Sequence, residues 1–158
     1  MATRSRIFIQ VRPETKGQTI TPEIGKLPEP FNPLKGVKIE PTTIEKEYIG
    51  IYHHWDGYPA GVGETLLNKY NDYDKALNLI LFGDESTING NEIVPYHYWR
   101  ENEPWKDTKP RQVDTIDQIP DEEYQYLLTP EGWLCNDGGY EWDGWKPLQE
   151  ILAAENEK

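Results

Sequence analysis

Cysteine is nearly absent from this chain, which has 158 residues and a single cysteine, Cys135. A lone cysteine excludes an internal disulfide framework and any zinc site built from several thiolates. We expect Cys135 to be a buried strand residue without chemistry. Long apolar runs are also lacking, because no stretch approaches the ~20 residues that a membrane span needs. Nothing at the start resembles a signal peptide, so we expect a cytoplasmic protein.

Basic residues are scarce in the last third of the chain. The net charge is −12, and residues 114–158 hold 12 acidic but only 2 basic residues. This balance argues against direct binding to duplex nucleic acid. An acidic segment rich in aromatics suits a basic partner surface, including one that normally grips nucleic acid. A solubilising acidic surface is the plainer interpretation. The candidate partner-binding residues are Glu131, Asp137, Glu141, Trp142, Asp143 and Trp145.

Aromatic residues, by contrast, are abundant: 6 Trp, 10 Tyr and 3 Phe indicate a folded chain with an aromatic-rich core. The length suits one domain covering residues 1–158. Residues 5–11 and 47–53 have the alternation of strands that pair as an antiparallel hairpin. Six prolines in residues 13–46 predict a Pro-rich insertion that forms the long loop between them.

The rest of the chain mixes helical and strand patterns. Residues 62–70 and 73–82 predict two helices, the second with Asp72 or Asp74 as its cap and Gly83 at its end. Residues 84–91 and 106–120 read as loop and polar connector, on either side of an aromatic stretch at 95–105. A hairpin is expected from 123–128 and 133–135, then a short strand at 140–142 and a helix from Pro147 to about residue 154. The order predicts an α+β domain, with an antiparallel sheet carrying two central helices and a C-terminal helix on one face.

The segment 50–63 combines histidines, aromatics, a carboxylate and glycines at a strand-to-helix turn. His54 and Asp56 lie two apart, so an extended backbone would place them on one face. They could act as a general base, or begin a metal site that His97 or Asp84 would complete. No further ligand spacing supports a metal, and a purely structural turn is the plainer interpretation. We expect no cofactor, no metal and no catalytic residue.

A nucleotide-binding interpretation of the same segment is also open. Trp55 or Tyr58 would stack a base, while helix amides and Arg4 or Arg6 hold a phosphate. The glycines match no phosphate-loop motif, so tight packing of the turn on the helix is their more common use. The candidate ligand-binding residues are Arg6, His54, Trp55, Asp56 and Tyr58.

Several motifs resemble a family of small accessory proteins of phages and prophages. The matching pieces cover most of the chain in order: the N-terminal Met-Ala-Thr-Arg-Ser, Ile51-Tyr52, His54 to Tyr58, Thr65 to Leu67, Leu81 to Ser86, and Glu122 to Leu127 with its hairpin to Trp133. This chain differs by its insertion at 13–46 and by His53, where many members have cysteine. The second difference argues against a catalytic or metal role that depends on His53 alone.

The resemblance implies a viral accessory protein that works in the host cytoplasm and is dispensable for building the virion. Such proteins often act against host defence. The leading hypothesis is therefore a non-enzymatic, anti-CRISPR-like inhibitor that binds a basic host protein, such as a nucleic-acid-binding defence effector, through the acidic aromatic segment. The alternatives are a protein that sequesters a nucleotide immune signal, often as an oligomer, and a hydrolase or lyase using His54 and Asp56.

Overall fold

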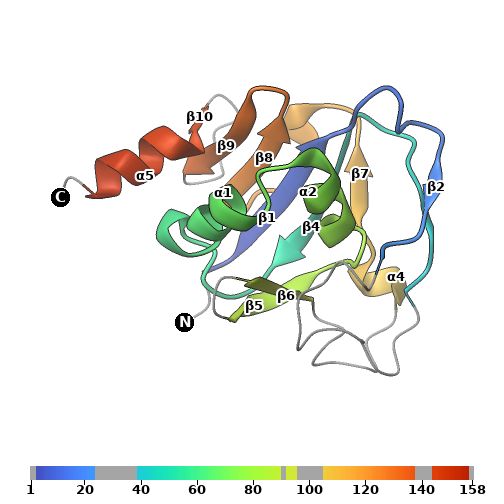
Figure 1. Cartoon of the computed structure of the whole chain (residues 1–158), viewed down its shortest axis with the longest axis horizontal. Helices are drawn as coiled ribbons and strands as arrows, with labels where there is room; N and C mark the ends of the chain where they lie inside the picture. Colours follow the sequence, from blue (N-terminus) through green and yellow to red (C-terminus); the bar gives the residue numbers. More distant parts are fainter. Residues whose placement is uncertain (1–2, 24–38, 90–91, 96–104, 138–143, 157–158) are drawn as a thin grey trace.

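The computed structural model describes residues 3–23, 39–89, 92–95, 105–137 and 144–156. Helices and strands are mixed in an α+β fold, as expected. Helices α1 (Glu64–Lys69) and α2 (Tyr73–Ile80) lie over one face of the main sheet, and α5 (Leu148–Asn156) extends from one end of it (Figure 1). None of the helices in this described part is long and apolar enough to cross a membrane.

The main sheet has the strand order β10-β9-β8-β1-β4-β5-β6, with β7 also paired to β4. The strands are β1 (Ser5–Gln10), β4 (Tyr48–His53), β5 (Glu85–Asn89), β6 (Glu92–Pro95), β7 (Arg111–Val113), β8 (Tyr124–Thr129), β9 (Gly132–Asp137) and β10 (Trp145–Pro147). Most pairs are antiparallel, but β1 with β8 and β4 with β5 are parallel.

One edge of strand β4 pairs with two different strands, and we call the place where the partner changes the fork of β4. One side pairs along its whole length with β1. The other side pairs first with β7, up to Gly50 opposite Arg111, and then with β5 at His53 opposite Glu85. Between the two partners, the backbone N–H of Tyr52 donates to the carboxylate of Asp84 over 3.0 Å. A side chain therefore satisfies the backbone group that neither neighbouring strand pairs, as a buried ladder requires.

The core consists of two clusters on opposite faces of the sheet, because successive side chains of β1 and β4 point to alternate faces. Ile7, Ile9, Ile49 and Ile51 point into the larger cluster, which includes the apolar stripe of α2. Phe8 lies on the opposite face with Ile119 and Leu127 in a smaller cluster. Side chains of successive strand residues leave opposite faces, so both faces of the central strands are buried over part of their length.

Local predictions from the sequence are confirmed where pairing is local or a cap is explicit. β1 pairs antiparallel with β4, and β8 with β9. The Asp72 side chain accepts a hydrogen bond from the Lys75 backbone at the start of α2, and Gly83 has φ +86° beyond its end. Cys135 is fully buried in β9. The two described ends of the Pro-rich insertion meet in a small hairpin of β2 (Thr19–Ile20) and β3 (Thr42–Thr43).

Two predictions were wrong. Residues 84–91 do not form only a loop, because β5 begins at Glu85 and adds to the sheet beside β4. Residues 106–120 are not a plain connector, since they contain most of α4 (Trp105–Thr108), β7 and the short helix η3 (Ile116–Gln118). The strands β5 and β7 were missed because their pairing with β4 is long-range. The predicted strand at 140–142 and most of the aromatic stretch at 95–105 lie outside the described residues.

Candidate functional site

The segment that follows β4 has an unusual backbone. Asp56 is the single non-glycine residue with positive φ, at +59°, in the described part of the chain. It is followed by a π-helical turn, η2 (Pro59–Gly63). Trp55 and Tyr58 are 43% and 41% exposed. Left-handed non-glycine residues, π-turns and exposed large aromatics are each uncommon and each concentrate at functional sites. We call residues 54–63 the motif loop.

The motif loop is held in place by buried contacts. The Gly57 backbone N–H donates to the Thr3 carbonyl over 2.9 Å, and the Tyr126 hydroxyl donates to the Gly57 carbonyl over 2.6 Å. A Cβ at Gly57 would lie 2.7 Å from the Thr3 oxygen and 2.8 Å from Oγ of Ser5, so only glycine fits. The loop backbone between the two exposed aromatics is therefore held in a defined conformation.

An unbroken series of ring contacts leads from the motif loop onto the sheet. The Trp55 ring meets His54 edge to face, with centroids 4.8 Å apart. Nδ1 of His54 lies 2.7 Å from the Tyr52 hydroxyl. The Arg6 guanidinium lies over the Tyr52 ring, 5.1 Å from its centroid. Arg6 and Tyr52 are opposite each other in the β1–β4 ladder, which explains why these side chains meet.

Four charged side chains surround this series, and we call them the charge group: Arg6, Asp84, Arg111 and Glu122. Arg111 donates to Asp84 over 3.4 Å, and Arg6 lies 3.8 Å from Glu122. Burial of the Arg6 guanidinium lowers its pKa, and the nearby charge of Arg111 lowers it further, while Glu122 and Asp84 act in the opposite sense. Two of its nitrogens, Nε and one terminal nitrogen, are buried without a hydrogen-bond partner among the described residues. The nearby carboxylates thus compensate the cationic charge of Arg6 incompletely.

Asp84 sits at the fork of β4. Burial raises its pKa to about 6, although the Tyr52 backbone N–H and the Arg111 guanidinium both favour the charged form. The carboxylate that partly neutralises Arg111 is therefore lost in mildly acidic solution. Arg111 remains accessible, since 42% of its side chain is exposed.

Behind the motif loop, on the helix-covered face, lies a buried polar pair. His53 and Glu85 are fully buried, and Nδ1 of His53 is 3.5 Å from a carboxyl oxygen of Glu85. Nε2 of His53 lies 2.5 Å from the Trp55 carbonyl, which only accepts, so the ring proton is placed on Nε2. Burial raises the pKa of Glu85 well above its ordinary value and lowers that of His53 to about 4. His53 is therefore neutral near pH 7, burial favours the neutral form of Glu85, and the burial of both groups excludes contact with a substrate.

The structure brings together most of the predicted ligand-binding residues. Arg6, His54 and Trp55 belong to one series of contacts. The Asp56 carbonyl accepts from the Val62 backbone in the motif loop, and Tyr58 is exposed beside them. Sequence reasoning missed Tyr52, Arg111 and Glu122, and it considered Asp84 only as a metal ligand that would complete a site with His54 and Asp56. Only the alternation of β1 and β4 carried a signal for one of them, Tyr52 opposite Arg6.

The predicted partner-binding residues are mostly not covered. Glu141, Trp142 and Asp143 lie outside the described residues, and only the backbone of Asp137 is described. Glu131 is exposed in the turn between β8 and β9. Trp145 is half-buried and packs against the small cluster of Phe8, Ile119 and Leu127, so it is in part a core residue.

Comparison with protein-family models, curated proteins and solved structures finds no match to this chain. Within the described residues, no three His, Cys, Asp or Glu side chains come close enough together to hold a metal ion. The motif loop and the charges around it are therefore the features that bear on function.

Proposed function

We propose that this protein acts by binding, and that its ligand is a small nucleotide-like anion held at the motif loop and its charge group. The observation that carries the proposal is the continuous series from exposed Trp55 through His54 and Tyr52 to the Arg6 guanidinium. An exposed aromatic ring stacks a planar base of any sequence, at about 1–3 kcal/mol per base. Guanidinium groups bind phosphate with matched geometry.

The negative net charge of the whole protein sets the region of Arg6 and Arg111 apart from the rest of the surface. With a net charge of −12, most of the surface repels an anion. Among the described residues, Arg6 pairs with the carboxylate of Glu122, and Arg111 pairs with that of Asp84. Arg111 is the accessible contact, and the more buried Arg6 strengthens the local positive potential. An anion that binds here pairs with the partly exposed Arg111, which favours this region over the acidic rest of the surface.

A nucleotide panel tests the proposal. Purified protein is mixed with cyclic mononucleotides, cyclic dinucleotides, ADP-ribose-type nucleotides and inorganic phosphate, and unfolding temperature and Trp fluorescence are followed. We expect a shift with one nucleotide class, lost in Trp55→Ala and reduced at least tenfold in affinity in Arg111→Gln, since a charge-assisted contact contributes about 1.5–3 kcal/mol. Lys75→Gln, at an exposed cation of α2 outside the motif loop and its charge group, is the control. A flat response to every nucleotide contradicts the proposal.

A second candidate function keeps the anti-CRISPR-like hypothesis. Its supporting observation is that the described part of the acidic segment exposes its carboxylates, at Asp114, Asp117, Asp121, Glu123, Glu131, Glu150 and Glu155. Such a surface attracts a basic host protein of the kind that grips nucleic acid. Capture from lysate of a bacterial host, repeated at high salt, tests it. Charge reversal at Glu131, Glu141 and Asp143 is expected to abolish capture without lowering the unfolding temperature. Unchanged capture by that variant argues against a charge-driven partner.

The hydrolase alternative has less support. A general base at His54 requires a partner that orients the imidazole and stabilises its charge. Nδ1 of His54 is engaged by the Tyr52 hydroxyl rather than by a carboxylate, and the Asp56 backbone is committed to the turn. The buried pair of His53 and Glu85 is closed to solvent. These contacts favour a role for His54 in positioning Tyr52 and Trp55.

A further inference from the structure

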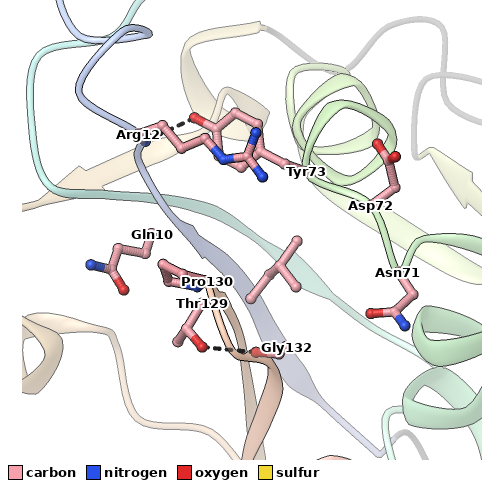
Figure 2. Close-up of a pocket in the computed structure, with 9 residues that line it drawn as sticks. Gln10, Arg12, Asn71, Asp72, Tyr73, Thr129, Pro130 and Gly132 are labelled. Carbon is pink, nitrogen blue, oxygen red and sulfur yellow. Dashed lines mark hydrogen bonds between the residues drawn. The ribbon is translucent and has the colours of Figure 1, made fainter.

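A cavity of about 300 Å³ opens on the molecule away from the motif loop. Three segments line it: the end of β1, the turn before α2, and the turn between β8 and β9 (Figure 2). Strands β1 and β8 are parallel neighbours, so their carboxyl ends reach this place together. The volume is at the lower end of the range for small-molecule pockets. The lining residues are Gln10, Arg12, Asn71, Asp72, Tyr73, Leu128, Thr129, Pro130 and Gly132.

Contacts with Tyr73 hold Arg12 at one side of the cavity before any ligand binds. Its guanidinium lies over the Tyr73 ring, 4.2 Å from the centroid, and its backbone N–H donates to the Tyr73 hydroxyl over 3.0 Å. That hydroxyl in turn donates to Thr15, over 3.0 Å in a buried contact. No ion pair between described residues includes Arg12. A stacked guanidinium keeps its edge N–H groups available, and a carboxylate is the partner that fits them in a fork.

Asp72 places a negative charge at the other side of the cavity. One of its oxygens caps α2 by accepting from the Lys75 backbone over 3.1 Å. The carboxylate has capacity for further donors. Asn71 and Gln10 add two side-chain carboxamides, and buried Leu128 supplies an apolar contact. Figure 2 shows Asp72 and Asn71 on one side of the lining and Arg12 with the Tyr73 ring on the other, with the Asp72 carboxylate turned toward the start of α2.

This distribution of charge selects the class of ligand. A phosphate dianion at Arg12 meets repulsion from Asp72, and a cation at Asp72 meets repulsion from Arg12. A dipolar ligand satisfies both charges at once. Carboxamides complement amide and ammonium groups, and an apolar floor accepts an aliphatic side chain.

We infer that this cavity is a second binding site, independent of the motif loop, for a small zwitterion of the amino-acid type. Arg12 binds its carboxylate, Asp72 accepts from its ammonium group, and Leu128 contacts its aliphatic part. A free amino acid and a short dipeptide share this chemistry.

Titrations followed by amide NMR signals of the full chain test the site, with ligand raised to about 10 mM, above the dissociation constants of weak small-molecule sites. The probes are leucine, glycyl-leucine and 4-methylpentanoate, which is leucine without its ammonium group. We expect leucine or glycyl-leucine to shift the signals of Gln10, Asn71 and Thr129, with 4-methylpentanoate binding at least fivefold more weakly. The two zwitterions distinguish the amino acid from the peptide. The absence of shifts with both overturns the inference.

Two variants separate the two charges. Asp72→Asn keeps a good helix cap, because asparagine and aspartate cap helices about equally well, but it removes the negative charge. In this variant the preference for leucine over 4-methylpentanoate should fall to about twofold or less. Arg12→Gln should weaken both ligands at least fivefold, and its NMR spectrum reports whether the fold is intact. Retained discrimination in folded Asp72→Asn overturns the assignment of Asp72, and unchanged affinity in folded Arg12→Gln overturns that of Arg12.

Discussion

His53 and Glu85 face each other across the parallel pair β4–β5, fully buried, with Nδ1 of the imidazole 3.5 Å from a carboxyl oxygen. The imidazole proton is on Nε2, directed at the Trp55 carbonyl, so Nδ1 presents its lone pair to Glu85. A protonated Glu85 is the form that suits this arrangement, in agreement with its raised pKa. Two neutral titratable groups therefore lie directly behind the motif loop.

This pair makes stability depend on pH in two opposite senses. Glu85 has a raised pKa in the folded state, so the stability it provides is present below about pH 4.5 and is lost as pH rises towards its folded pKa. Glu85→Gln supplies a neutral amide in place of the protonated carboxyl. We expect this variant to unfold at a higher temperature than the unmodified protein at pH 8, and at a similar temperature at pH 4. Thermal unfolding of both proteins across that range is the measurement. If Glu85→Gln unfolds at an equal or lower temperature than the unmodified protein at pH 8, the charged form of Glu85 does not destabilise the fold.

His53 determines how the stability of the protein falls in acidic solution. Its pKa is lowered to about 4 in the folded state, so stability is lost as pH falls from about 6.5 through 4. The shift corresponds to about 3 kcal/mol when fully expressed, at 1.36 kcal/mol per unit. Glu85→Gln keeps His53 and should keep this loss. Urea unfolding at pH 7 and pH 4 measures it, and a flat profile in Glu85→Gln would contradict the assignment to His53.

Gly57→Ala should destabilise the protein by about 2 kcal/mol or more, the scale of severe overpacking. The new methyl group would lie 2.7 Å from the Thr3 backbone oxygen, which has no flexible side chain to move. Gly17→Ala is a contrasting variant: unlike Gly57, Gly17 has positive φ, and no atom lies within 4 Å of its Cβ, so its loss is a backbone cost of about 1 kcal/mol without crowding. Chemical denaturation of the two variants distinguishes them, and similar losses would show that crowding at Gly57 is relieved.

Tyr126→Phe removes the hydroxyl that donates to the Gly57 carbonyl in a buried site. The carbonyl then loses a partner, and a loss of about 1–3 kcal/mol in unfolding free energy is expected. Tyr58→Phe, at an exposed ring of the same loop, should change stability by less than about 0.5 kcal/mol. Urea denaturation measures both variants. A stability loss in Tyr58→Phe as large as in Tyr126→Phe would contradict the role given to the buried hydroxyl.

Binding of an anion at the charge group should depend on Asp84. Its pKa of about 6 means that the carboxylate becomes neutral as pH falls below that value, and the local potential then becomes more positive. Affinity for a cyclic nucleotide should rise about fivefold between pH 7 and pH 5, on the scale of ~1 kcal/mol for a partly exposed charge pair. Asp84→Asn should bind more tightly at pH 7 and lose most of this dependence. Calorimetric titration at both pH values provides the measurement, and an unchanged dependence in Asp84→Asn assigns it to another group.

The elements that sequence reasoning predicted correctly are those with local signals. Strand β1 alternates, α2 has an apolar stripe with a cap at Asp72 and a left-handed Gly83, and β8 and β9 flank a turn with Pro and Gly. Strand β5 has no such signal, because it pairs with β4 in parallel at one register position, and Glu85 is polar yet buried. Strand β7 is three residues long and reaches β4 from more than 50 residues away.

The amino-acid sequence by itself determined the fold class, the hairpins and helices with local caps, and the motif that carries Trp55, Asp56 and Gly57. These follow from side-chain periodicity and from backbone preferences of neighbouring residues, which act over a few positions. Only the tertiary structure decided that Asp84 and Arg111 meet Tyr52 and Arg6 at the fork of β4, and that Arg12 and Asp72 face one cavity. Those contacts join segments far apart in the chain, so they depend on strand order and packing, which local preferences do not specify.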